Sequence, residues 1–106
     1  MEFLNRIEIK GIIGNIRLTD VSDNKCARLS VATNYCYNSI DGCAVIETTW
    51  HDCVAWGNQH PIVSNLSKGD AVHIIGRLKQ VRYCGADGVE HTANQIIVSK
   101  LDKISE

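Results

Sequence analysis

The segment from Glu47 to Gly57 carries both tryptophans of the chain, Trp50 and Trp56, at positions of the same parity. Successive side chains of a strand point to opposite faces, so the two indole rings would share one face with Asp52. The alternate positions hold small, mostly apolar residues that suit a packed interior. Large aromatic rings beside a charge are typical of a surface that meets a flat partner, such as a nucleic-acid base. Rings that cover a core or a subunit contact would give the same pattern, and both interpretations stay open.

A second segment, Gly76 to Tyr83, alternates cations with an aromatic ring. Arg77, Lys79 and Tyr83 would lie on one face of a strand, where they could follow phosphates and stack on a base. Arg82 adds charge near the next turn. Such alternation also occurs on ordinary solvated surfaces. If both segments belong to one barrel, however, together they favour non-specific binding of a nucleic-acid single strand.

Catalytic and metal-binding interpretations fit the chain less well. His51 and Asp52 are neighbours on a strand and point apart, while Cys53 shares the interior face with His51. The five cysteines form no C-x-x-C pair, and no spacing of Cys and His resembles a known ligand set. We therefore expect no enzyme activity, no metal, no cofactor and reduced cysteines.

Length and charge limit the remaining possibilities. A chain of 106 residues allows one small domain, and 44% hydrophobic with 22% charged residues is ordinary for a globular protein. The net charge of −1 gives no overall attraction to nucleic acid, so any such binding depends on local placement of Lys and Arg. The charged N-terminus does not resemble a signal peptide, and no stretch is long enough to span a membrane. We expect a cytoplasmic protein.

Turn signals divide the chain into five strand-like segments and one short helical segment. The strand-like segments are 7–13, 27–33, 47–57, 71–83 and 89–101. Apolar spacing after Pro61 predicts one or two helical turns before Lys68. Five strands with one helix between the third and fourth are the arrangement of the five-stranded Greek-key barrel called the OB-fold. An open α+β sheet would also fit, but one short helix could not cover five strands, so we expect an all-β barrel over residues 1–106.

Several motifs resemble those of the bacterial single-stranded-DNA-binding protein family. Asn5 to Gly11 resembles the family's opening N-[KR]-apolar-strand-G, and Leu29 to Thr33 resembles its F/L-S-[LV]-A-T strand. Thr49 to Gly57 is similar to its [TE]-W-H-x-[VC]-V-x-[FW]-G strand. Leu66 to Leu78 is similar to its L-x-K-G-x-x-V-x-[IV]-x-G-x-[LI] segment. The match runs from about Asn5 to Leu101, nearly the whole chain.

The resemblance implies a function, a site and an assembly. It implies binding of single-stranded DNA in replication, repair or recombination, near the bacterial nucleoid, by a homodimer or homotetramer that also meets replication or repair proteins. The implied base-stacking aromatics are Tyr37, Trp50, Trp56 and Tyr83, and the implied backbone-binding residues are Arg77, Lys79 and Arg82. The implied subunit contacts are Arg6, Ile7, Glu8, Ile9, Lys10 and His51.

Three departures from the family pattern leave a second interpretation open. Asp52 stands where a basic residue is common and would repel phosphate, and Glu8 and Lys10 make the first strand less apolar than usual. The family's flexible tail with its acidic tip is absent from these 106 residues, so recruitment of enzymes through it is not expected. A trimmed domain and a short tail-less relative, as the primosomal replication protein N is, both fit. The alternative function is a protein–protein adaptor, primosome-like or from a mobile element, on the same barrel.

Overall fold

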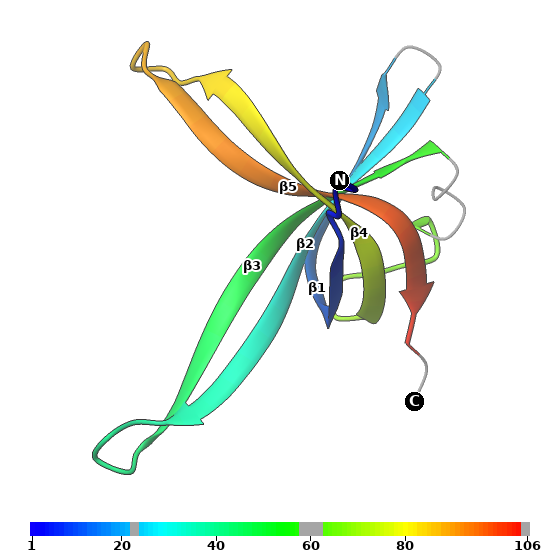
Figure 1. The fold of residues 1–106 in the computed structure, drawn as a ribbon. Coiled ribbons are helices and arrows are strands. Elements are labelled where there is room, and N and C mark those ends of the chain that lie inside the picture. The colour runs from blue at the N-terminus through cyan, green and yellow to red at the C-terminus, as the bar shows by residue number, and fades with distance from the viewer. Residues whose placement is uncertain (22–23, 58–62, 105–106) are drawn as a thin grey trace.

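Five strands close into a barrel in the order β1-β2-β3-β5-β4 (Figure 1). The computed structural model describes residues 1–21, 24–57 and 63–104. The strands are β1 (Ile7–Val21), β2 (Asn24–Asn38), β3 (Ala44–Trp56), β4 (Ala71–Cys84) and β5 (Glu90–Lys103). All neighbours pair antiparallel except β3 and β5, which pair in parallel over two residues. The predicted all-β five-stranded barrel is therefore confirmed.

The helix expected between the third and fourth strands is not among the described elements. Residues 58–62, which include Pro61, lie outside the described residues. From Val63 the described chain makes a single turn, in which the Leu66 amide donates to the Val63 carbonyl oxygen at 2.9 Å. Both side chains are buried in the barrel core. Only the part of the expected helix from Val63 onward is described: Val63 is helical, a turn follows, and the apolar spacing of Val63 and Leu66 corresponds to two core contacts.

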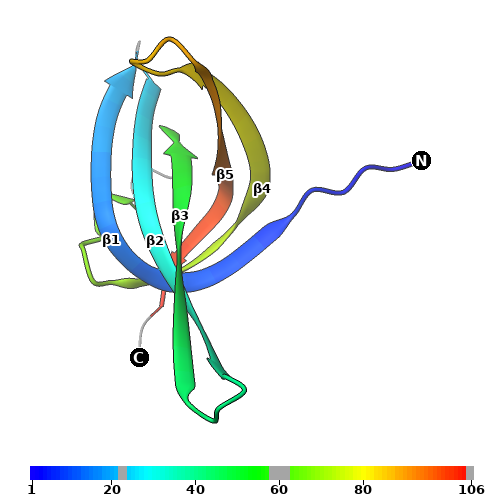
Figure 2. The same ribbon diagram turned by 90° about the vertical axis from the view of Figure 1, so that its left-hand side faces the viewer.

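β1 changes neighbours part-way along its length. It pairs with β4 from Ile7 to Ile12 and with β2 from Ile12 to Val21. Gly11 precedes the change, and a Cβ atom there would lie 2.4 Å from the carbonyl oxygen of Ala32. Only a residue without a side chain lets the two backbones approach so closely. This exchange of neighbours lets one strand complete two parts of the barrel wall (Figure 2).

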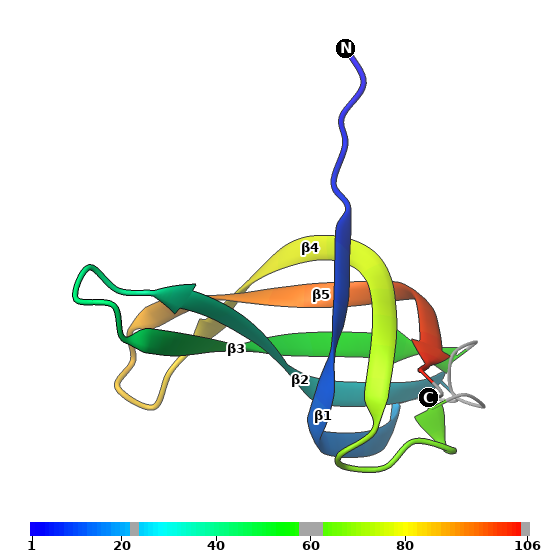
Figure 3. The same ribbon diagram turned by 90° about the horizontal axis from the view of Figure 1, so that it is seen from below.

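Two hairpins project from the same side of the barrel (Figures 1 and 3). In the β2–β3 arm, residues 33–49, the two strands pair only with each other, from Thr33 opposite Thr49 to Asn38 opposite Ala44. In the β4–β5 arm, residues 80–94, pairing continues to Cys84 opposite Glu90. No helix of the described residues is long and apolar enough to cross a membrane. The arms enlarge the surface that the small barrel offers to a partner.

Candidate nucleic-acid interface

Both tryptophans lie on the outer face of β3, as the alternation predicted. Trp50 is 60% exposed and Trp56 is 44% exposed, whereas the intervening Cys53 and Ala55 are buried in the core. Val54 shares the outer face but is itself buried beside β5, where it pairs with Ile97. At about 3.3 Å per residue, the two tryptophans start roughly 20 Å apart along the strand. We call the outer face of β1, β2 and β3 between and around these rings the tryptophan face.

The indole of Trp50 lies against a glycine of β1. A Cβ atom on Gly14 would be 2.4 Å from Cζ3 and 2.6 Å from Cη2 of Trp50. Gly14 falls at the register shift of the β1–β2 pair, between Ile13 and Asn15. The missing side chain makes room for the ring, so the ring is supported by backbone while much of it stays in solvent. The sequence analysis assigned no role to Gly14, because the contact depends on a neighbouring strand.

Asp52 is paired with a cation that the sequence analysis did not single out. Its Oδ2 accepts a hydrogen bond from Nη2 of Arg28 at 2.6 Å, and Nε2 of Gln95 lies 3.4 Å from the same oxygen. Both charged side chains remain partly exposed, at 50% for Arg28 and 35% for Asp52. The repulsion expected from Asp52 is therefore offset locally. The outward position of Arg28 in the alternating segment 27–33 was the signal that could have found it.

Two surface hollows meet at this ion pair and join the tryptophan face to β4. The first hollow is lined by Asn15, Arg17, Arg28, Ser30 and Asp52. The second is lined by Arg28, Asp52, Val81, Tyr83, Ala93 and Gln95. In the β4–β5 register, Lys79 is opposite Gln95 and Arg77 is opposite Ile97. The predicted strip of Arg77, Lys79 and Tyr83 thus continues the surface that carries Trp50 and Trp56.

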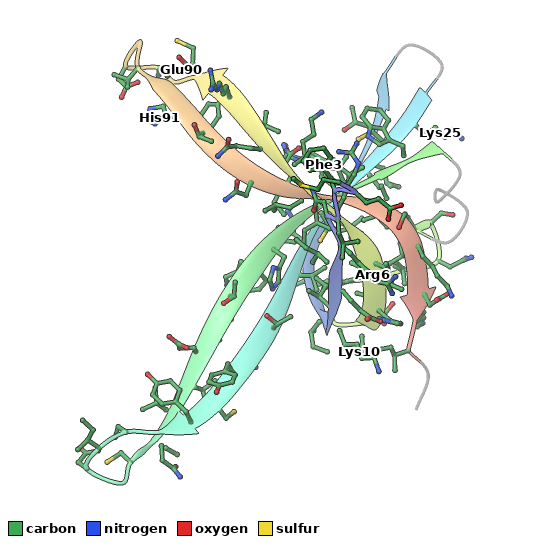
Figure 4. All side chains as sticks on the ribbon, viewed as in Figure 1. Phe3, Arg6, Lys10, Lys25, Glu90 and His91 are labelled. Carbon is green, nitrogen blue, oxygen red and sulfur yellow. The ribbon has the colours of Figure 1, made fainter. Side chains whose placement is uncertain are left out.

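Tyr83 and Arg82 point to opposite faces of the β4–β5 arm. The Tyr83 ring stacks on His91 with centroids 5.4 Å apart and planes 27° apart, and Tyr83 remains 51% exposed. Arg82 lies 3.8 Å from the carboxylate of Glu90 instead. Figure 4 labels His91 and Glu90 near the tip of this arm. The structure therefore brings Tyr83, but not Arg82, to the tryptophan side.

Tyr37 is also separated from the tryptophans. The β2–β3 register places Ala32 opposite Trp50 and runs without a shift to Tyr37 opposite Val45. Because positions 32 and 37 differ in parity, Tyr37 lies on the other face of the β2–β3 arm. There its ring is 6.0 Å from that of Tyr35. A nucleic-acid strand that touched both Tyr37 and Trp50 would have to pass around the β2–β3 arm.

The first half of β1, expected at a subunit contact, carries charges on its outer side. Ile7 and Ile9 pack against the core, while Glu8 reaches His73 of β4 at 2.6 Å between Oε2 and Nε2. The His73 hydrogen bond lowers the pKa of Glu8 below its ordinary 4.5, helped by nearby positive charges. Arg6 and Lys10 lie two residues to either side of Glu8 along the chain (Figure 4).

The remaining subunit-contact candidate lies elsewhere on the sheet. The half-buried His51 bonds to the Thr33 hydroxyl, with 2.8 Å between Nε2 and Oγ1. The hydrogen-bond partner of His51 is thus on β2, whereas that of Glu8 is on β4.

Chemistry other than binding finds little support at this surface. Burial, with the charge of Asp52, raises the pKa of the Cys53 thiol to about 12, so the thiol stays protonated and non-nucleophilic at neutral pH. Burial also raises the pKa of Cys26. Within residues 1–21, 24–57 and 63–104, no three His, Cys, Asp or Glu side chains gather as a metal site would require. The surface can offer aromatic rings, guanidinium groups and an ammonium group.

The chain is similar in sequence to known single-stranded DNA-binding proteins. The family model described as "Single-strand binding protein family" matches residues 4–104. Single-stranded DNA-binding proteins of Neisseria meningitidis serogroup B and Xanthomonas axonopodis pv. citri are each 30% identical, over 102 and 104 residues, covering 92% and 95% of this chain. The chain spans only 58% of the length of these relatives.

Solved structures share the fold at lower identity. The Plasmodium falciparum SSB complex with ssDNA superposes with a TM-score of 0.89 at 24% identity, covering 99% of this chain and 98% of that one. A deletion mutant of the single-stranded DNA binding protein from Thermus aquaticus gives 0.81 at 18% identity, covering 96% of this chain and 51% of that one. At these identities the likeness concerns the barrel itself.

Proposed function

The chain belongs to the single-strand binding protein family, as its motifs indicated, and we propose that it binds single-stranded DNA without sequence preference, through the tryptophan face and the outer side of β4. The observation that carries the proposal is the placement of Trp50, whose ring lies against Gly14 and is still 60% exposed. A ring supported from below and open to solvent is suited to stack on a base. The proposed activity is binding, without a catalytic step or a cofactor.

The proposed contacts divide into stacking and charge. Trp50, Trp56 and Tyr83 would each stack on a base, which contributes about 1–3 kcal/mol per base and works with any base because all have a π-face. Arg77 and Lys79 would bind phosphates between the stacked positions. Since the net charge is −1, attraction to DNA has to come from this local cluster.

Tyr37 and Arg82 belong to the proposal as outlying contacts. Each lies on the far face of its arm, so a strand would reach them after passing around the arm. Tyr37 would act with Tyr35 as a second aromatic pair, and Arg82 would exchange Glu90 for a phosphate. We propose that these contacts are secondary to those of the tryptophan face, because the DNA strand has to follow a longer path to reach them.

Self-association completes the proposal. From Ile7 to Gly11, β1 pairs with β4 on one edge, while its pairing with β2 starts only at Ile12. The other edge could pair with the same segment of a second copy, since exposed strand edges tend to be paired or guarded. We propose that residues 1–106 act as one such domain in a homodimer or homotetramer, with Arg6 to Lys10 and His51 near the contact. Replication, repair and recombination are the proposed processes.

One feature favours a second candidate, a protein–protein adaptor. The sequence holds no Lys or Arg between Arg28 and Lys68, so the β2–β3 arm carries acidic but no basic side chains. Tyr35, Ile40 and Ile46 are widely exposed on this arm. An arm of this composition suits a protein surface better than a phosphate backbone. Under this alternative the arm docks on a replication protein and DNA contacts are secondary.

Titration of the intrinsic tryptophan fluorescence with oligo-dT distinguishes the two functions. Strand binding predicts saturable quenching, because both tryptophans lie in the proposed site, and an affinity that falls steeply with added salt. The adaptor function predicts no quenching at micromolar protein even in low salt. Absence of quenching together with absence of a mobility shift would reject strand binding.

A further inference from the structure

We propose that Arg17 and Arg28 form a phosphate-binding site at the centre of the tryptophan face, and that Asp52 holds Arg28 in the free protein until a DNA phosphate replaces it. This inference rests on the proposed function and deepens it. It assigns roles to two arginines that neither the sequence motifs nor the family resemblance identified.

The register places the two arginines side by side. Arg17 of β1 is directly opposite Arg28 of β2, and both line the hollow that also holds Asn15 and Ser30. Directly opposed side chains on one face start about 5 Å apart at Cβ, so two guanidinium groups are brought close together. Two forked donor groups with an amide and a hydroxyl beside them match the oxygens of a phosphodiester.

The hollow lies between the two aromatic platforms. On β3, Asp52 is opposite Ser30, two residues from Trp50, and Val54 is opposite Arg28, two residues from Trp56. A single strand that stacked one base on each tryptophan would therefore carry its backbone across the arginine pair. Position as well as charge makes this the point where a phosphate is expected.

Asp52 explains how two opposed arginines are tolerated without DNA. Like charges directly opposite each other destabilise a sheet, and a carboxylate that pairs with one of them offsets this cost. Asp52 does so from the diagonal position, at 2.6 Å from Nη2 of Arg28, and Gln95 lies 3.4 Å from the same carboxylate oxygen. Among the described side chains, no ion pair involves Arg17. Arg17 is thus open to solvent, whereas Arg28 is paired with the carboxylate of Asp52, which a phosphate can displace.

Binding then proceeds as an exchange of anions. A phosphate that enters the hollow meets Arg17 first and takes over the Arg28 guanidinium, and Asp52 keeps Gln95 as a neighbour. The free energy needed to break the exposed Arg28–Asp52 pair is lost from the affinity for DNA. The Asp52 carboxylate therefore competes with the DNA phosphate for Arg28. Its removal should strengthen binding more when Arg28 is present than when Arg28 is absent.

The test measures the anisotropy of fluorescein-labelled oligo-dT titrated with the 106-residue chain at several NaCl concentrations. Variants are Arg17→Gln, Arg28→Gln, Asp52→Asn and the double variant Arg28→Gln/Asp52→Asn. Lys100→Gln is the control, because Lys100 is an exposed cation of β5 paired with Asp102, outside the hollow. Thermal melting checks that each variant is folded.

We expect each arginine variant to flatten the slope of log K against log[NaCl] by about 0.7, the value for one lost phosphate contact on a single strand. Lys100→Gln should leave the slope unchanged. Asp52→Asn should raise affinity by about two- to fivefold, the range of an exposed ion pair. This gain should be smaller in the Arg28→Gln background, where only the direct repulsion between Asp52 and the phosphate is left to remove.

Two results would overturn the inference while leaving strand binding intact. Unchanged salt slopes in both arginine variants would remove the phosphate site. A gain from Asp52→Asn that is as large or larger without Arg28 would remove the exchange. A wild-type protein that fails to bind oligo-dT would overturn the proposed function and this inference with it.

Discussion

Trp50 shows how a single side chain becomes a binding platform. Its position in a strand sets the face, but its orientation depends on Gly14, a residue of another strand. Backbone support beneath the ring fixes one side of the indole and leaves the other for a partner. Trp56 lacks such a glycine contact among the described residues and is less exposed. The two rings should therefore respond differently to mutation.

Trp56→Ala should weaken oligo-dT binding by about 1–3 kcal/mol with little change in salt slope, because stacking is lost while phosphate contacts remain. Anisotropy titration at two salt concentrations measures both quantities. If the ring instead holds a subunit contact, the variant would bind normally but show a smaller mass in light scattering. That outcome would favour the adaptor function.

Gly14→Ala should displace the Trp50 ring without unfolding the barrel. The new Cβ atom would lie 2.4 Å from the far edge of the indole, and a side chain can move aside more easily than backbone. We expect a shift of tryptophan emission and weaker oligo-dT binding with little loss of thermal stability. Gly57→Ala is the matched control, since a Cβ there meets no atom of the described residues within 4 Å. Equal binding by the two variants would contradict the platform role.

At this scale, the sequence predicted which residues face outward but not which residues they touch. Parity placed Trp50, Trp56 and Tyr83 on exposed faces without knowledge of the fold. Gly14 and Arg28 were missed because their roles depend on cross-strand register and on an irregularity in β1. A single sequence carries little information about either.

Among the elements, the first half of β1 is held to β4 partly by the Glu8–His73 pair. The pKa of Glu8 is depressed below 4.5, so the pair stabilises the fold above that pH, and the contribution is lost as the pH falls through the folded pKa. Glu8→Gln should therefore lose less stability than wild type between pH 6 and about pH 3. Urea midpoints at the two pH values measure this difference, with Glu2→Gln as control. A wild-type-like loss in Glu8→Gln would contradict the pairing.

The strands are longer than their sequence patterns predicted. β1 continues past the expected residue 13 to Val21, and β2 continues past residue 33 to Asn38. The added residues of β2 lie in the two-stranded β2–β3 arm, where both faces are exposed, so no apolar alternation marks them. In the added part of β1, Ile16 and Leu18 do alternate with polar residues, a signal that the predicted end at residue 13 left out. Alternation indicates burial on one side, which is why the outer part of the β2–β3 arm was missed, whereas both strands of the β4–β5 arm were predicted within a few residues.

For the whole molecule, we expect at least a dimer. The free edge of β1 from Ile7 to Gly11 needs a partner or a guard, and Glu8 already faces His73 of the same chain. Light scattering at micromolar protein should give a mass of at least twice 11.7 kDa. A monomer under these conditions would mean that the charged side chains of β1 guard the edge instead.

The chain has only two tryptophans, so NMR of their indole N–H signals tests the central claim most directly. Both signals should shift as oligo-dT is added and should saturate together, because one strand crosses both rings. Trp50→Phe assigns the two signals. If neither signal moves at oligo-dT concentrations that saturate a mobility shift, the strand binds elsewhere and the tryptophan face is not the DNA site.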